Sequence, residues 1–151
     1  STRTAVWVGH GGGDEHTRGD SATLGCGGRP GVVALTWTDD GASPQYDSAR
    51  DAFERLSAAT DARGRHFEIH KLHQPGPLYL TEEESRGVDA VEGTQPRLAG
   101  ARLAASYANF YIANGVVAVP VFVDPRDGAA LERTAGPVPP RAGSPLPLIA
   151  I

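Results

Sequence analysis

Apolar residues recur along this chain in two periods, one typical of strands and the other of helices. Residues 32–38 are apolar and rich in β-branched side chains, and the turn-forming residues 39–41 follow, so we expect a buried strand there. Residues 67–72 alternate in part and predict a second strand. Between them, apolar residues at three- and four-residue spacing predict a helix with one apolar face: Ala49, Ala52, Phe53, Leu56 and Ala59.

Helix-capping residues indicate where this helix begins and ends. Ser43 is a suitable N-cap, and Pro44 suits the first helical position because it has no N–H to leave unpaired there. At the other end, Arg63 complements the negative end of the helix dipole, and Gly64 tolerates a left-handed cap. We therefore predict a helix that closes at Arg63 and Gly64.

The second half of the chain predicts a hairpin followed by a helix. The aromatic-rich residues 103–112 suit a strand, and Asn114-Gly115 favours a two-residue turn. Residues 116–122 are continuously apolar, so we expect a return strand buried on both faces, with Pro120 at an edge or bulge. Asp124-Pro125 then predicts a helix that runs to about Glu132.

Glycine and proline mark the irregular parts. Residues 6–8 predict a short strand. Residues 9–31 and 74–77 are expected to form loops, and residues 81–84 open either a short helix or a charged loop. The order of elements is mixed α/β, without an internal repeat in the sequence. We divide the chain into a loop-like N-terminal segment (1–31), one folded region (32–133) and a proline-rich, disordered tail (134–151).

Composition excludes several classes of protein. The net charge of −4 argues against nucleic-acid binding, which needs a basic patch. No apolar stretch is as long as a membrane span, so we expect no membrane association. Cys26 is the single cysteine, which excludes an internal disulfide and favours a cytoplasmic location.

Two charged clusters have both a functional and a structural interpretation. His66, His70 and His73 lie close enough in sequence for a zinc site, but no carboxylate or cysteine completes a clear ligand set, so we expect no metal. The acidic residues 82–84 either bind a polyamine-like cation or form a solvated loop.

Four long motifs carry a resemblance to a known family. They are Thr36-Trp37-Thr38-Asp39-Asp40, Thr60-Asp61-Ala62-Arg63-Gly64-Arg65, Lys71-Leu72-His73-Gln74-Pro75-Gly76-Pro77-Leu78-Tyr79 and the thirteen-residue stretch 103–115. In this order and spacing they resemble the C-terminal half of the agmatine deiminases, which are peptidyl-arginine deiminase-like members of the pentein superfamily.

The resemblance implies a fold and a reaction. The fold is a partial pentein α/β-propeller with mixed sheets, of which this chain supplies two or three of five ββαβ-type units. The reaction hydrolyses agmatine to N-carbamoylputrescine and ammonia, as a step of putrescine biosynthesis, with no metal or organic cofactor. A cysteine thiolate attacks the guanidinium carbon, a histidine moves protons, and carboxylates hold the cationic group.

The sequence departs from the family where these catalytic groups belong. Asp20 stands where the family has its histidine, and Ala22 where it has a guanidinium-binding aspartate. His16 or His10 is the alternative base, although neither is followed two residues on by an aspartate. The nucleophile motif Asn-Ile-His-Cys does not occur, and Cys26 is either incidental or a relocated nucleophile. We therefore expect an inactive chain with no intact catalytic residue.

Two further expectations follow from the same comparison. Val123 replaces the glycine of a family Phe-Gly-Asp-Pro pattern, and would be strained if that position needs a positive φ. The altered ends suggest truncation or a frameshift, with ordinary divergence as the rival explanation. An incomplete propeller exposes strand edges, so a non-catalytic role is the alternative: the chain pairs with itself or with a complementary deiminase chain.

Overall fold

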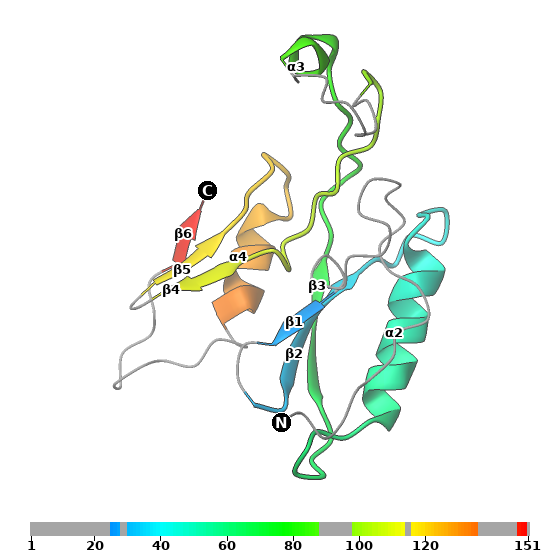
Figure 1. Ribbon diagram of the computed structural model, residues 1–151, viewed down its shortest axis with the longest axis vertical. Coiled ribbons are helices and arrows are strands. Elements are labelled where there is room, and N and C mark those ends of the chain that lie inside the picture. Colours follow the sequence, from blue (N-terminus) through cyan, green and yellow to red (C-terminus); the bar gives the residue numbers. More distant parts are fainter. Residues whose placement is uncertain (1–24, 28–29, 88–97, 114–115, 136–147, 151) are drawn as a thin grey trace, which may run out of the picture.

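The computed structural model describes residues 25–27, 30–87, 98–113, 116–135 and 148–150 of the chain (Figure 1). In this part of the chain, two three-stranded sheets carry the fold, one in each half of the sequence. The predicted strand at residues 6–8 lies outside the described residues. Among the described residues, no helix combines the length and the apolar character that crossing a membrane requires.

The first sheet has the strand order β1-β2-β3 and mixed directions. β2 (Val32–Trp37) pairs antiparallel with β1 (Gly25–Gly27) and parallel with β3 (Glu68–His73). β2 and β3 confirm the two predicted strands, and almost every residue of β2 is buried, as its apolar run requires.

β1 corrects the prediction that all of residues 9–31 form a loop. Its sequence, Gly-Cys-Gly, has no β-branched or apolar pattern, yet Cys26 pairs with Ala34 along the ladder. Strand pairing uses backbone N–H and C=O groups, which glycine supplies as well as any residue. The sequence could not reveal this strand because its partner, rather than its own side chains, defines it.

α2 (Tyr46–Ala58) connects β2 to β3 and covers one face of the first sheet (Figure 1). Its apolar stripe packs on the inward side chains of β2, and the buried residues of this cluster are Leu35, Trp37, Ala49 and Ala52, with Phe53 and Leu56 beside them. The predicted apolar face is therefore confirmed. The predicted start is two residues early, because Ser43 and Pro44 lie in a turn and Gln45 occupies the N-cap position.

The predicted end of this helix is wrong by five residues. α2 stops at Ala58, and Ala59 is already extended. Gly64 does have positive φ, as expected, but in a tight loop rather than a helix cap. The Asp61 carboxylate organises that loop, because it accepts hydrogen bonds from the backbone N–H groups of Arg63 and Arg65 and from the Arg65 guanidinium.

The opposite face of the first sheet is covered by α4 (Asp127–Ala135) and by residues 103–110. This second cluster has the buried residues Ala34, Leu72, Tyr107, Ala108 and Ala130. Thr36 and Ser106, which lie 70 residues apart, share a buried hydrogen bond of 2.8 Å at the same interface. The first sheet is thus packed on both faces, as the continuous apolar run of β2 indicates.

Residues 103–110 do not form the predicted strand. Three consecutive residues, Ser106, Tyr107 and Ala108, are all buried, and the backbone turns at Tyr107 and Ala108 instead of extending as a strand. Hydrogen bonds within the segment, such as Ala108 N–H to Ser106 Oγ at 3.2 Å, replace a ladder. Of the predicted strand, only Tyr111 and Ile112 belong to a strand, β4 (Tyr111–Ala113).

The second sheet has the order β4-β5-β6. β5 (Val116–Val119) pairs antiparallel with β4, and the register of Ala113 with Val116 confirms a hairpin with a two-residue connection. The turn residues themselves, 114–115, lie outside the described residues. β5 is shorter than predicted and ends before Pro120, and its burial alternates, so it is not buried on both faces.

The predicted disordered tail includes regular structure. α4 continues across residue 134 to Ala135, and β6 (Leu148–Ala150) pairs parallel with β5. Residues 136–147 lie outside the described residues. As with β1, the pairing strand lies far from its partner in sequence, so local composition gives little sign of it.

The turn between β5 and α4 contains the expected strained residue. Val123 has a φ of 56° and is fully exposed, which confirms that a valine stands in a left-handed position. The helix starts at Asp127 rather than at Asp124-Pro125. The Asp127 carboxylate accepts hydrogen bonds from the backbone N–H groups of Phe122 and Asp124, which fixes the turn.

A two-stranded ribbon projects from the body and carries α3 (Glu82–Arg86) (Figure 1). Tyr79 and Arg102 form a bridge along it, and Leu80 N–H donates to the Ala101 carbonyl at 2.8 Å. Thr81 and Glu84 form a capping box at the start of α3, which settles the choice between helix and charged loop. α3 has no buried residue.

The two halves share one order of elements. Each has a short strand, an antiparallel partner, a helix and a third strand parallel to the second, so each is a ββαβ unit with a mixed sheet. The α/β class is therefore confirmed, together with a repeat that the sequence does not display.

Candidate active-site pocket

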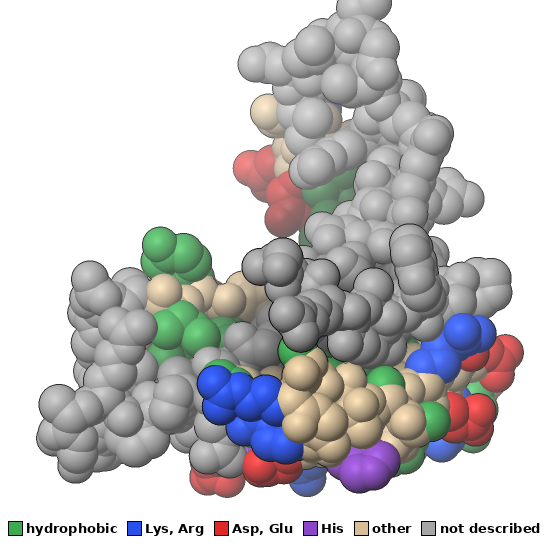
Figure 2. All heavy atoms as spheres, turned by 60° about the horizontal axis from the view of Figure 1, so that its bottom comes forward, with side chains coloured by type: hydrophobic (Ala, Val, Ile, Leu, Met, Phe, Trp, Pro, Cys, Tyr) green, Lys and Arg blue, Asp and Glu red, His purple; other side chains and the backbone are tan. Residues whose placement is uncertain are grey.

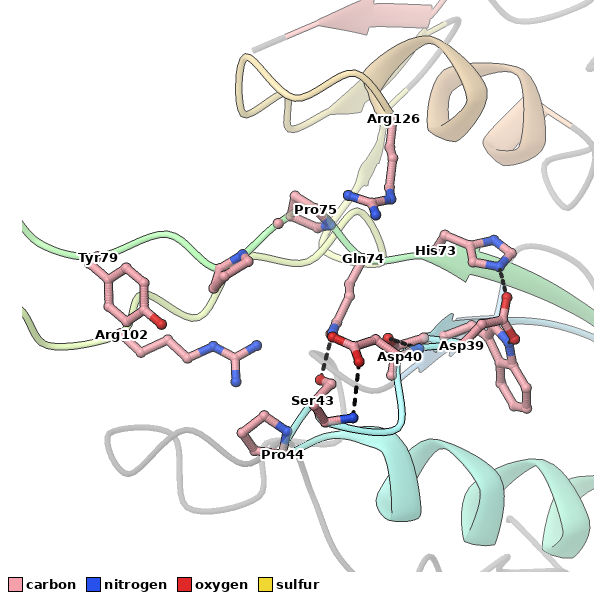
Figure 3. Close-up of a pocket in the computed structure, with 15 residues that line it drawn as sticks. Asp39, Asp40, Ser43, Pro44, His73, Gln74, Pro75, Tyr79, Arg102 and Arg126 are labelled. Atoms are coloured by element: carbon pink, nitrogen blue, oxygen red, sulfur yellow. Dashed lines mark hydrogen bonds and ion pairs between the residues drawn. The ribbon is translucent and has the colours of Figure 1, made fainter.

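A pocket of about 410 Å³ lies among the described residues at the carboxyl ends of β2 and β3 (Figure 3). Because these neighbouring strands are parallel, the residues that follow them meet at one edge of the sheet, where open α/β sheets commonly bind ligands. Two carboxylates, an imidazole and two guanidinium groups line it: Asp39, Asp40, His73, Arg102 and Arg126. This charge content distinguishes it from a mere packing gap.

Asp39 is held by three neighbours. Its Oδ1 accepts a hydrogen bond from the Trp37 indole N–H at 2.9 Å, and its Oδ2 lies 2.8 Å from His73 Nε2. These hydrogen bonds, from Trp37 first and then from His73, together with the charge of Arg50, lower the pKa of Asp39. Asp39 is therefore an oriented, ionised carboxylate at neutral pH, and the His73 ring is fixed against it.

Trp37 is itself fixed by cations. Its side chain is buried, and the ring lies 3.6 Å from Lys71 Nζ and 4.8 Å from the Arg50 guanidinium carbon. The negative face of an aromatic ring attracts such cations. This packing points the indole N–H toward Asp39, so the position of that carboxylate depends on the core beneath the pocket.

Two hydrogen bonds join the loops on either side of the pocket. The Gln74 side chain donates to Ser43 Oγ at 3.1 Å, and the Gln74 backbone N–H donates to the Trp37 carbonyl at 2.9 Å. Ser43 N–H in turn donates to the Asp40 carbonyl at 3.0 Å. The loop after β2 and the loop after β3 are thus one connected wall.

The third side of the pocket comes from the second half of the chain. Asp124 Oδ2 accepts a hydrogen bond of 2.7 Å from the Gly76 N–H, which lowers the pKa of Asp124. A Cβ at position 76 would lie 3.2 Å from that oxygen, so glycine permits this close contact. Arg126 pairs with Asp124 at 3.5 Å, and its guanidinium extends toward the pocket (Figure 3).

Asp20 and Ala22, where we expected altered catalytic residues, and His10 and His16, the alternative bases that we considered, lie outside the described residues. Cys26 is placed by its backbone alone, in β1 opposite Ala34.

The three other histidines do not converge. His66 forms a bridge with Thr60, His70 Nε2 lies 2.7 Å from Glu68, and His73 contacts Asp39. Within the described part of the chain, no three His, Cys, Asp or Glu side chains are grouped as a metal site would require.

Sequence reasoning did not assign a role to the pocket residues, although Asp39, Asp40, His73 and Gln74 stood in the quoted motifs. The usable signal was that polar residues directly follow two neighbouring strands with a helix between them. Arg102 had no comparable signal, because its ribbon enters the pocket from a distant part of the sequence.

The face drawn in Figure 2, which is turned away from this pocket, has basic and acidic side chains beside one another among the described residues. This view agrees with the acidic net charge.

Comparisons with known proteins agree with one another. Residues 1–148 match the model of the family described as Porphyromonas-type peptidyl-arginine deiminase. A Listeria monocytogenes protein provisionally named agmatine deiminase 1 is 58% identical over 105 residues, which are 70% of this chain and 29% of that protein. The agmatine deiminase of Medicago truncatula is 51% identical over 123 residues, 81% of this chain and 33% of its own length.

A solved structure is similar along nearly the whole chain. The agmatine deiminase of Enterococcus faecalis, described as catalysing its reaction, superposes with a TM-score of 0.83 and 38% identity. The match covers 97% of this chain and 38% of the Enterococcus chain. The sequence therefore spans about a third of the length of the relatives that it matches.

Proposed function

Because the chain belongs to the family of Porphyromonas-type peptidyl-arginine deiminases, we propose that it is part of an agmatine-deiminase-type hydrolase. The observation that carries this proposal is the 58% identity over 105 residues with the Listeria protein. The reaction converts agmatine and water to N-carbamoylputrescine and ammonia. We place it in the cytoplasm and in putrescine biosynthesis.

The fold supports a place for the chain within a larger propeller. The two ββαβ units have the same strand order and the same strand directions. In our proposal they are two of the five units of a pentein, and the rest of the hydrolase supplies the others. Repeated units with unsatisfied edges gain stability by pairing with further copies.

The reaction demands three kinds of group. A guanidinium is a poor electrophile because its charge is delocalised, so a thiolate must attack its carbon while carboxylates pair with the cation. Ammonia then leaves, and water hydrolyses the resulting thiouronium to free the thiolate. A base must take and return the protons of these steps.

We propose that residues 1–151 alone do not complete this chemistry. An unperturbed aspartate has a pKa near 4 and is a poor proton carrier near neutral pH, so Asp20 is a poor replacement for a histidine, and the alanine at position 22 cannot bind a cation. Asp39, which stays ionised, and His73 supply a carboxylate and an imidazole in the pocket. Neither is a nucleophile suited to a guanidinium.

The test is ammonia release from agmatine by the purified chain, with a full-length agmatine deiminase at equal concentration as the positive control. We expect no release above the rate without protein. Release that disappears in Cys26→Ser would overturn the proposal of inactivity, because it would identify Cys26 as the nucleophile. Release that persists in that variant would contradict the thiolate mechanism for this chain.

The second candidate function is a non-catalytic subunit that pairs with another deiminase chain or with itself. Large apolar side chains are exposed among the described residues, namely Tyr79, Leu98, Tyr111 and Val123. Such side chains commonly mark association surfaces when they gather into patches. Size-exclusion chromatography, alone and with a full-length deiminase, tests this: a new, larger species supports pairing, and an unchanged compact monomer argues against it.

A further inference from the structure

Two opposite charges face the pocket without meeting each other. Asp40 stands on the wall formed by the loop after β2, and Arg102 reaches into the pocket from the projecting ribbon (Figure 3). No ion pair joins them, which means that their charged atoms are more than 4.0 Å apart. The space between them is open to a ligand.

Neither charge has an ionic partner among the described residues. Asp40 Oδ1 accepts the backbone N–H of Ala42 at 2.9 Å, which leaves Oδ2 and the formal charge available. The Arg102 guanidinium has no hydrogen bond or ion pair with any described side chain, although the residue is half-buried. In contrast, Asp39 and Asp124 are each satisfied by neighbours.

A second guanidinium, that of Arg126, also lines the pocket, and its charge is paired with Asp124. Arg126 enters from the turn before α4, and its partner Asp124 is also held by Gly76 N–H (Figure 3). A planar guanidinium presents paired N–H groups that match the two oxygens of a carboxylate. Near Asp40, the Ser43 hydroxyl and the Gln74 side-chain amide also line the pocket, so the carboxylate lies among further polar groups.

We propose that this pocket binds a small zwitterion that carries a guanidinium or ammonium group at one end and a carboxylate at the other. Asp40 pairs with the cationic end, and Arg102 pairs with the carboxylate. A ligand with two cationic ends would leave Arg102 facing a like charge, which disfavours binding. The volume of about 410 Å³ accommodates a molecule of this class with room for water.

The inference rests on the pocket and does not require hydrolysis by this chain. Its test is a comparison of two ligands of nearly equal shape, 4-guanidinobutanoate and agmatine. They share a guanidinium on a short chain, but the first ends in a carboxylate and the second in an ammonium. Isothermal titration with the complete 151-residue chain measures both dissociation constants at low ionic strength, where exposed charges are least screened.

The proposal predicts that 4-guanidinobutanoate binds at least about 10-fold more tightly than agmatine, the size of a single charge-assisted contact. Arg102→Gln should remove this preference, and Asp40→Asn should weaken both ligands. Arg86→Gln is the matched control, because it removes one positive charge at an exposed site of α3 outside the pocket. It should leave both constants within about 2-fold.

Several results would overturn the proposal. They are equal or tighter binding of agmatine by the unaltered chain, no binding of 4-guanidinobutanoate, and an unchanged preference in Arg102→Gln. Circular dichroism of each variant establishes that it is folded. If Arg102→Gln unfolds, Arg102→Lys keeps the charge without the paired donors, and should lower the affinity for 4-guanidinobutanoate while retaining the preference over agmatine. This binding readout is independent of ammonia release, so it can fail while the proposed function stands.

Discussion

The hydroxyl of Tyr107 donates a 2.6 Å hydrogen bond to the carboxylate of Asp127, 20 residues further along the chain. Tyr107 is buried, and burial first and the Asp127 carboxylate second raise the pKa of its hydroxyl. Burial acts to raise the pKa of Asp127, but hydrogen bonds from Tyr107 and from backbone N–H groups outweigh it and lower that pKa. This contact joins the irregular segment 103–110 to the start of α4.

Tyr107→Phe should therefore lower the free energy of unfolding by about 1.5–3 kcal/mol, the usual range for a hydrogen bond to a charged group. The ring and its edge contact with Phe122 remain, so the loss reports on the hydroxyl. Urea unfolding measures it. Tyr111→Phe is the control, because Tyr111 is 69% exposed, and it should change stability by less than about 0.5 kcal/mol. Equal effects of the two substitutions would contradict this role of the hydroxyl.

Val123→Gly should stabilise the protein by about 1 kcal/mol. A left-handed φ costs an L-residue about 1–2 kcal/mol, and glycine avoids that cost. Glycine also gives the unfolded chain more conformational freedom, which offsets part of the gain in stability. The valine side chain is 100% exposed, so its removal forfeits no packing. Thermal unfolding measures the change. Ala129→Gly, at an exposed position inside α4, should destabilise by about 1 kcal/mol, and the opposite signs distinguish local strain from a general glycine effect.

Thr36→Val and Ser106→Ala should each destabilise the protein, by about 1–3 kcal/mol, because each removes one partner of a buried hydrogen bond. The double variant should cost less than the sum of the two, with a coupling of about 1 kcal/mol, since it removes both partners together. A double-variant cycle by urea unfolding measures the coupling. Thr36→Val combined with Val123→Gly supplies the additive reference, because the fully exposed Val123 shares no packing with Thr36. Strict additivity of Thr36→Val and Ser106→Ala would show that the two hydroxyl groups do not stabilise the protein through a shared hydrogen bond.

Acid should weaken the loop that follows α2. The Arg65 side chain first, and the Arg65 backbone N–H second, lower the pKa of Asp61 from 3.8 to about 2. Because the folded pKa lies below the unfolded one, this stabilisation is complete above about pH 4 and is lost as the pH falls through about 2. Asp61→Asn should therefore be less stable than the unaltered chain at neutral pH, and the difference should shrink in acid. Urea unfolding along a pH series measures it, with Glu54→Gln, an exposed carboxylate of α2, as the control.

The predictions that succeeded were those that neighbouring residues decide. The apolar runs of β2 and β3, the apolar face of α2 and the hairpin of β4 and β5 each follow from a short stretch of sequence. Val123 was recognised for a local reason as well, since a single replaced glycine indicated the φ at that position. The long motifs identified the family in the same way.

The predictions that failed depended on distant partners. Residues 103–112 have the composition of a strand, but residues 103–110 form local hydrogen bonds instead of a ladder, and Tyr107 and Ala108 pack between the first sheet and α4 in that irregular conformation. The end of α2 was misplaced because Gly64 serves a loop organised by Asp61 rather than a helix cap. A propensity favours a conformation only while tertiary packing does not oppose it.

The sequence by itself determined the α/β class, the strands and helix around residues 32–73, and membership of the deiminase family. Tertiary structure alone decided that Gly25–Gly27 and Leu148–Ala150 are strands, that the two halves are matching ββαβ units, and that Asp40 and Arg102 line one pocket. The physical reason is the same in each case. Strand pairing uses backbone groups that every residue except proline carries in full, and a pocket forms from residues that only the folded chain brings together.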